Sequence, residues 1–134
     1  MENVVKHRPA VDDPLWDEIR QETELEAGRE PILASFLHAT ILNHDGLPAA
    51  VSFHLANMLD SPTAPALLLR EVMEQAFAAD PGIVDAMRAD IRAVKERDSA
   101  CDKYSTPLLY FKGLHALQAY RVGHWLWAQQ RTEL

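Results

Sequence analysis

Six histidines are the side chains of this 134-residue chain that could most readily bind a metal. A di-iron helical bundle places a Glu three residues before each ligating His, on the same helix face. None of the six histidines has a Glu at that position, and no two of them are four residues apart. His115 and His124 are nine residues apart, which puts them on opposite sides of a helix. The spacing therefore predicts no metal site, and it favours surface, capping or core-edge roles for the histidines.

The single cysteine, Cys101, is the other side chain that could act as a nucleophile. No base is identifiable beside it, and the neighbouring carboxylates of Asp98 and Asp102 oppose a negatively charged thiolate. A structural role is therefore expected for Cys101. Because one cysteine cannot form an intrachain disulfide, we also expect a reducing, cytoplasmic environment.

Residues 95–104 form a charge-rich segment, with six charges of both signs among ten residues. Loops that are held between rigid helices often carry binding residues. An exposed carboxylate in this loop could pair with the ammonium group of a substrate through a charge-assisted hydrogen bond. Composition alone favours a solvated connector, so both interpretations stay open at this point.

The elements that position these side chains are predicted to be helices. Most of the eight prolines follow, or lie close to, an Asp, Glu, Ser or Thr, which is typical of helix N-termini. Apolar spacing agrees, and no alternating Val/Ile/Thr run indicates a strand. The pattern predicts an all-α bundle of about six helices over residues 13–134, preceded by a flexible arm over 1–12. The helices are expected at about 14–27, 31–43, 47–59, 63–79, 81–96 and 107–130.

Helical periodicity also predicts which side chains are buried. We expect apolar faces made by Leu15, Ile19 and Leu25; by Ile32, Phe36, Ala39 and Leu42; by Val51, Leu55, Met58 and Leu59; by Leu68, Val72, Ala76 and Ala79; and by Ile83, Met87, Ile91 and Val94. The aromatic residues of the last helix are expected in the core and in a subunit contact. They are Tyr110, Phe111, Tyr120, Trp125 and Trp127.

The composition excludes several classes of partner. Thirteen basic against twenty acidic residues give a net charge of −7, which argues against nucleic-acid binding. No window approaches the roughly 18 apolar residues of a membrane span, and residues 1–11 do not resemble a signal peptide. We therefore expect small molecules or other proteins as partners. The last predicted helix runs to residues 131–134 without Gly, Asn or Pro, so we expect it to be uncapped and to continue in a longer protein.

The run STPLLYFKGLHALQAYRVGHWLW, residues 105–127, resembles the end of the helical N-terminal domain of bacterial serine O-acetyltransferase. Residues 30–40, 55–62 and 70–81 are similar to the same family, so the resemblance spans about 13–130. It implies transfer of an acetyl group from acetyl-CoA to the hydroxyl of L-serine, in cysteine biosynthesis. In that family a left-handed parallel β-helix carries the catalytic histidine and most of the CoA site. This sequence has no hexapeptide repeat, so no catalytic residue and no bound cofactor are assigned to it.

The resemblance also implies one substrate-binding residue. The family's loop reads Arg-Asp-Pro-Ala, and its Asp helps to bind the amino acid, either L-serine as substrate or L-cysteine as inhibitor. The matching residue is Asp98, within Arg97-Asp98-Ser99-Ala100. Ser99 stands where the family has proline, which makes the loop less stiff. Leu114 stands where the family has Phe, a packing change from which we expect little effect.

The family also implies partners. By this resemblance the chain is expected to assemble as a hexamer, a dimer of trimers in which the helical domains make contact. The family's C-terminal tail, which docks into cysteine synthase, is absent from this sequence. Two functions are therefore expected as alternatives. The chain is the oligomerising, substrate-loop domain of an acetyltransferase and is inactive alone, or it is a naturally short paralogue that acts as an interaction or regulatory module.

Overall fold

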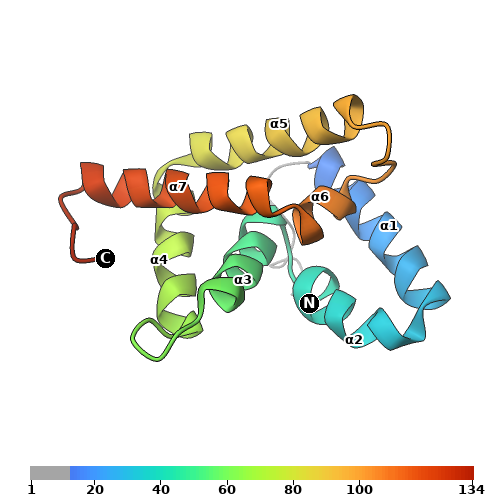
Figure 1. Cartoon of the computed structure of the whole chain (residues 1–134), viewed down its shortest axis with the longest axis horizontal. Helices are drawn as coiled ribbons and strands as arrows, with labels where there is room; N and C mark the ends of the chain where they lie inside the picture. The colour runs from blue at the N-terminus through green and yellow to red at the C-terminus, as the bar shows by residue number, and fades with distance from the viewer. Residues whose placement is uncertain (1–12) are drawn as a thin grey trace, which may run out of the picture.

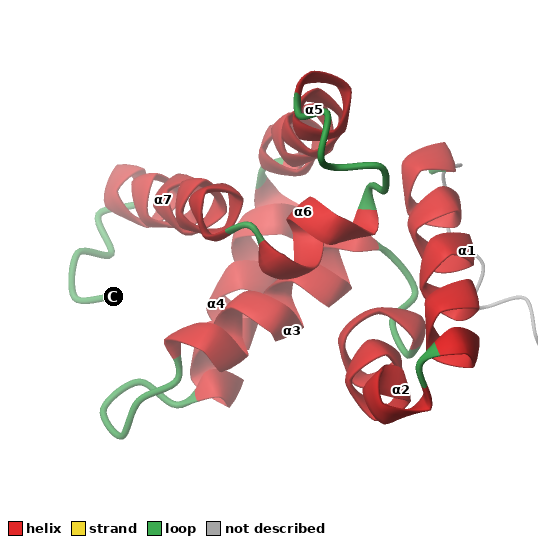
Figure 2. Cartoon of the chain, turned by 45° about the vertical axis from the view of Figure 1, so that its right-hand side comes forward, coloured by secondary structure: helices red, strands yellow, loops and turns green. Residues whose placement is uncertain are grey.

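The computed structural model describes residues 13–134, and every regular element among these residues is a helix (Figures 1 and 2). The expected arm over 1–12 lies outside the described residues. The α-helices are α1 (Pro14–Arg29), α2 (Ala34–Leu37), α3 (Leu47–Leu59), α4 (Ala66–Ala79), α5 (Pro81–Arg97), α6 (Ser105–Tyr110) and α7 (Lys112–Ala128). Two further segments, η2 (Pro31–Leu33) and η3 (His38–Leu42), flank α2. The all-α prediction is confirmed, with seven α-helices in the described part where about six were expected.

Two of the predicted N-terminal caps form as the sequence indicates. The side chain of Asp13 accepts a hydrogen bond of 3.2 Å from the backbone N–H of Trp16, and α1 follows. The side chain of Asp80 accepts a hydrogen bond of 3.1 Å from the N–H of Gly82 and caps the N-terminus of α5. In both helices proline occupies the first turn, where its missing N–H would have had no helical partner.

The prediction of a single α-helix over 31–43 is wrong, because the segment combines three types of helix. The segment begins as a 3₁₀ turn, continues as α2, and ends as the π-helical η3. A change of helical pitch rotates the side chains relative to a 3.6-residue repeat. The predicted face therefore fails, since Ile32 is 89% exposed while Leu37 and Ile41 are fully buried.

Other expectations about these faces and helix starts also need correction. Leu25, Met58, Leu59, Leu68 and Ala79 are exposed rather than buried. Helix α4 begins at Ala66 instead of 63, because residues 61–64 form a turn and the residue before Pro65 is disfavoured in a helix. The carboxylate of Asp60 accepts a hydrogen bond of 2.8 Å from the N–H of Ala66, the first residue of α4.

The predicted helix over 107–130 is interrupted at Phe111, whose backbone is extended between α6 and α7. Its end is also capped, contrary to the expectation of an uncapped end. Gln130 adopts a left-handed conformation with φ of 61°, and the N–H of Arg131 donates 2.9 Å to the carbonyl of Leu126. With the bond from the N–H of Gln130 to the carbonyl of Trp127, this is a Schellman motif in which glutamine takes the usual glycine position.

The helices pack in pairs around one core. Helices α3 and α4 form an antiparallel pair, α5 and α7 lie side by side, and α1 packs against η3 (Figure 1). The core draws on every helix except η2, and its fully buried members include Leu15, Ile19, Leu37, Ile41, Leu47, Met87 and Ile91. The buried face predicted for α5 is thus largely confirmed. Within 13–134, no helix has both the length and the apolar content needed to cross a membrane.

Candidate functional site

Asp98 lies at the point where α5 ends and the charge-rich loop begins. Its backbone N–H donates 2.9 Å to the carbonyl of Val94, which closes the helix. The side chain is exposed, and one of its oxygens, Oδ1, accepts a hydrogen bond of 2.9 Å from the N–H of Ala100. This short-range bond fixes the direction of the carboxylate, as in an Asx turn.

The loop over 98–104 is fastened to α1. Both carboxylate oxygens of Glu22 accept backbone hydrogen bonds, 3.2 Å from Tyr104 and 2.9 Å from Ser105. Lys103 forms a 3.2 Å ion pair with Glu26, one turn further along α1. The side chain of Cys101 is buried and its Sγ donates 3.2 Å to the carbonyl of Lys103, consistent with the structural role expected for it. The loop is therefore an ordered connection, although residues 98–100 and 102 are exposed to solvent.

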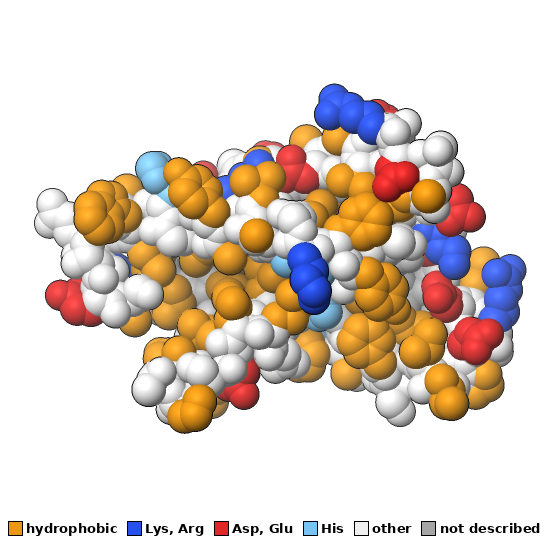
Figure 3. All heavy atoms as spheres, in the orientation of Figure 1, with side chains coloured by type: hydrophobic (Ala, Val, Ile, Leu, Met, Phe, Trp, Pro, Cys, Tyr) orange, Lys and Arg blue, Asp and Glu red, His pale blue; other side chains and the backbone are white. Residues whose placement is uncertain are grey.

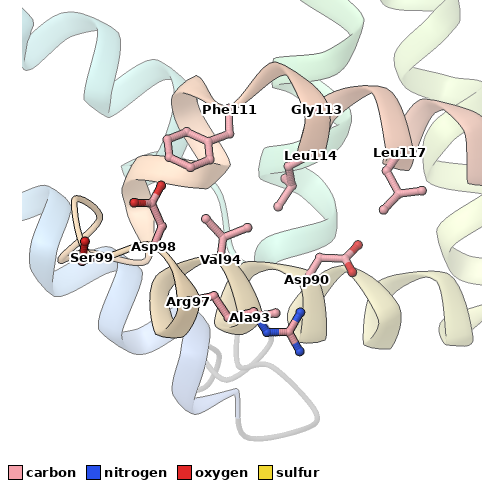
Figure 4. Close-up of a pocket in the computed structure, with 10 residues that line it drawn as sticks. All are labelled: Asp90, Ala93, Val94, Arg97, Asp98, Ser99, Phe111, Gly113, Leu114 and Leu117. Carbon is pink, nitrogen blue, oxygen red and sulfur yellow. The ribbon is translucent and has the colours of Figure 1, made fainter.

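Asp98 lines an open pocket of about 710 Å³ between α5 and α7 (Figure 4). One wall comes from α5 and the start of the loop, and the other from Phe111 and the first turns of α7. The lining residues are Asp90, Ala93, Val94, Arg97, Asp98, Ser99, Phe111, Gly113, Leu114 and Leu117. The pocket is thus largely apolar, with charged groups on its α5 side.

The two carboxylates that line the pocket, Asp90 and Asp98, differ in their ion-pair partners. Asp90 is matched by Arg121, at 2.6 Å, and by the amide of Gln118, at 3.1 Å. Asp98 has no ion-pair partner within residues 13–134. It also follows the C-terminus of α5, where the helix dipole favours a cation. At this end of the pocket Asp98 and the C-terminus of α5 therefore contribute negative charge, and Arg97 is the basic residue of the lining.

The histidines serve other purposes in the described part of the chain. None lines the Asp98 pocket. The Nε2 atoms of His54 and His115 donate to the carbonyls of Leu109 and Leu108, at 2.9 and 2.7 Å. Burial lowers the pKa of both imidazoles, although these hydrogen bonds oppose part of that effect. The two side chains therefore cap the C-terminal end of α6, in agreement with one of the roles predicted for the histidines.

No group of three or more His, Cys, Asp or Glu side chains within 13–134 is arranged to hold a metal ion.

Sequence reasoning selected Asp98 but missed the rest of the pocket. Helical spacing could have added Asp90 and Val94, which lie eight and four residues before Asp98 on the same face of α5. The opposite wall depends on how α5 packs against α7 and on the interruption at Phe111. The tether by Glu22 joins residues 82 and 83 positions apart, so no local pattern in the sequence indicates it.

Fold and loop together define an all-α domain that presents a carboxylate in an open pocket. A family model described as "Serine acetyltransferase, N-terminal" matches residues 15–119. Serine acetyltransferase of Escherichia coli K12 is 57% identical over 120 residues, which are 90% of this chain and 44% of that protein. The chain therefore belongs to the serine acetyltransferase N-terminal family, and it spans less than half the length of this relative.

Solved structures of serine acetyltransferases are similar in fold. One in complex with CoA and one in complex with cysteine are each 50% identical with a TM-score of 0.87, and they cover 89% of this chain. Those matches take in 51% and 46% of the solved chains. The soybean enzyme complexed with serine is 46% identical, with a TM-score of 0.85 over 89% of this chain and 49% of its own.

Proposed function

We propose that this chain is the N-terminal helical domain of a serine O-acetyltransferase, and that Asp98 binds the ammonium group of L-serine or of inhibitory L-cysteine. The observation that carries the proposal is the position of Asp98, a carboxylate without an ion-pair partner in 13–134 at the end of α5, facing an open pocket. An amino acid brings an ammonium group that such a carboxylate can bind through a charge-assisted hydrogen bond. Solved relatives in complex with serine and with cysteine support this choice of ligand.

The domain would orient the amino acid rather than perform the chemistry. Acetyl transfer from acetyl-CoA requires a base that removes the serine hydroxyl proton. No histidine lines the Asp98 pocket, so we assign the base, and the CoA contacts, to the part of the enzyme that follows this domain. On this proposal the 134-residue chain is inactive by itself.

Steady-state kinetics of the complete reading-frame product test the role of Asp98. In Asp98→Asn we expect the KM for L-serine to rise by about tenfold or more, because a charged hydrogen bond is lost, while the KM for acetyl-CoA is unchanged. Inhibition by L-cysteine should weaken in parallel. Asp102→Asn is the matched control, since Asp102 is an exposed carboxylate of the same loop that does not line the pocket. Equal effects of the two substitutions, or none, would overturn the assignment.

We also propose that the domain self-associates. Several aromatic and aliphatic side chains are exposed on α6 and α7, among them Tyr110, Leu117, Tyr120 and Trp127. Figure 3 shows hydrophobic side chains gathered along the visible face of α7 and over α6 and α2. Light scattering of the chain should give the mass of a dimer or larger assembly at micromolar concentration, and a monomer would contradict this proposal.

The exposed apolar side chains equally suit the alternative function, a naturally short interaction or regulatory module. The coding sequence after residue 134 distinguishes the two. Hexapeptide repeats there support the acetyltransferase domain, whereas an immediate stop codon supports the short module.

A further inference from the structure

We propose that Glu22 of α1 is a positioning residue for Asp98. The inference rests on the proposed function, because it concerns the loop that presents Asp98 to the amino acid. Glu22 does not line the Asp98 pocket, and its action would pass through the backbone of residues 98–104. This role separates it from the other acidic residues of α1, of which only Glu26 also contacts the loop.

The contact is made by both carboxylate oxygens. Oε2 accepts 3.2 Å from the N–H of Tyr104, and Oε1 accepts 2.9 Å from the N–H of Ser105. These N–H groups belong to the N-cap residue and to the first residue of α6, where no helical carbonyl is available to them. The residue before α6, Tyr104, gives no side-chain cap. Glu22 therefore supplies from another helix the cap that the local sequence lacks.

A chain of short contacts leads from this tether back to the Asp98 carboxylate. The carbonyl of Lys103 accepts from the buried thiol of Cys101 at 3.2 Å. The N–H of Cys101 in turn donates 2.9 Å to the carbonyl of Asp98, and the N–H of Ala100 donates 2.9 Å to its Oδ1. Ser99 has no ring to restrict its φ angle, so the turn depends on these contacts for its shape.

The other tethers of the loop are weaker by their nature. The side chains of Lys103 and Glu26 are 33% and 27% exposed, and ion pairs of this kind contribute little net stability. The ammonium group of Lys95 lies 4.7 Å from the centre of the Tyr104 ring, a cation–π contact near the surface. Neither contact engages the backbone N–H groups. Removal of Glu22 therefore frees the downstream end of the loop even when both remain.

Amide hydrogen exchange of the isotope-labelled chain, followed by NMR, tests the tether without any ligand. In Glu22→Ala we expect exchange at the Ala100 and Cys101 amides to accelerate by about tenfold or more, because the turn that protects them opens more often. Glu22→Gln keeps one oxygen acceptor and should give an intermediate acceleration. Glu24→Gln, which removes the same charge two residues away, should leave both amides unchanged. Should Glu22→Ala fail to fold, Glu22→Gln decides by the same measurement.

Calorimetric titration with L-serine, on the complete reading-frame product, links the tether to binding. We expect the Kd for L-serine to rise about three- to tenfold in Glu22→Ala. The reason is that a displaced Asp98 carboxylate makes a weaker hydrogen bond to the ammonium group of serine. Val72→Ala truncates a buried side chain of α4, and it should lower the Tm without changing this Kd. Two outcomes overturn the positioning role. One is an unchanged exchange rate at the Ala100 amide in both Glu22 variants. The other is an unchanged Kd for L-serine in both Glu22 variants while Asp98→Asn raises that Kd. If Asp98→Asn itself leaves serine binding unaltered, the proposed function fails, while the exchange measurement still judges the tether.

Discussion

At the scale of single residues, His54 and His115 explain how α6 can end after six residues without leaving buried carbonyls unpaired. Their rings lie 5.1 Å apart and nearly perpendicular, and each donates from Nε2 to a carbonyl of the last turn of α6. The second nitrogen of His115, Nδ1, is buried and has no hydrogen-bond partner among residues 13–134. Both bonds require only the neutral imidazole, and a proton added to Nδ1 of His115 would be buried without an acceptor.

This arrangement predicts a stability that falls as the solution becomes acidic. Burial lowers the pKa of His44, His54 and His115 from the ordinary value of 6.5, so the unfolded chain binds protons at a higher pH than the folded one. Their contribution is therefore fully present above about pH 6.5 and is lost as the pH falls toward the folded values. Urea unfolding at a series of pH values should show a falling midpoint below pH 6.5.

Substitution of His115 isolates its share of this dependence. His115→Gln retains an N–H donor near the position of Nε2 but does not titrate, so its pH dependence should be flatter than that of the wild type. His115→Leu leaves the Leu108 carbonyl unpaired and should cost about 1–3 kcal/mol at neutral pH. His124→Gln serves as the control, because His124 is exposed on α7. An equally steep pH dependence in His115→Gln would contradict this account.

At the scale of the elements, the sequence predicted helices well where local chemistry decides them. Asp13 and Asp80 mark the starts of α1 and α5, and the 3.6-residue period located the buried face of α5. The prediction failed where distant contacts decide the backbone. The interruption at Phe111 is stabilised by His54, more than fifty residues earlier, and the start of α6 by Glu22. For the same reason the sequence indicated one residue of the candidate site but not its opposite wall.

The end of α7 offers a stabilising substitution. Gln130 holds the left-handed position of the Schellman motif with φ of 61°, which a side chain with a Cβ adopts at a cost of about 1–2 kcal/mol. Gln130→Gly removes this strain but adds freedom to the unfolded chain, so we expect a net gain of about 0.5–1 kcal/mol in the free energy of unfolding. Chemical denaturation measures the gain. Gln129→Gly is the control, since Gln129 has a φ of −88° and should gain nothing there.

At the scale of the whole molecule, the proposed self-association leads us to expect the contact with a second copy on the exposed face of α7. Leu117, Tyr120, His124 and Trp127 follow helical spacing along one stripe, and Trp127 is 69% exposed. A large exposed aromatic residue in such a stripe is typical of an interface that is covered in the assembly.

Replacement of Trp127 therefore tests where the proposed self-association occurs. If the α7 stripe forms the contact, Trp127→Ser should raise the dissociation constant by about thirtyfold, as expected for the loss of a buried aromatic anchor. Analytical ultracentrifugation over a concentration series measures this shift. Leu25→Ser is the matched control, because Leu25 is 62% exposed but lies on α1. Dissociation by Leu25→Ser with no effect of Trp127→Ser would place the interface on the α1 side, away from the stripe. Because both side chains are exposed, each variant should keep its helical circular dichroism spectrum, so a change in mass reports on association rather than on unfolding.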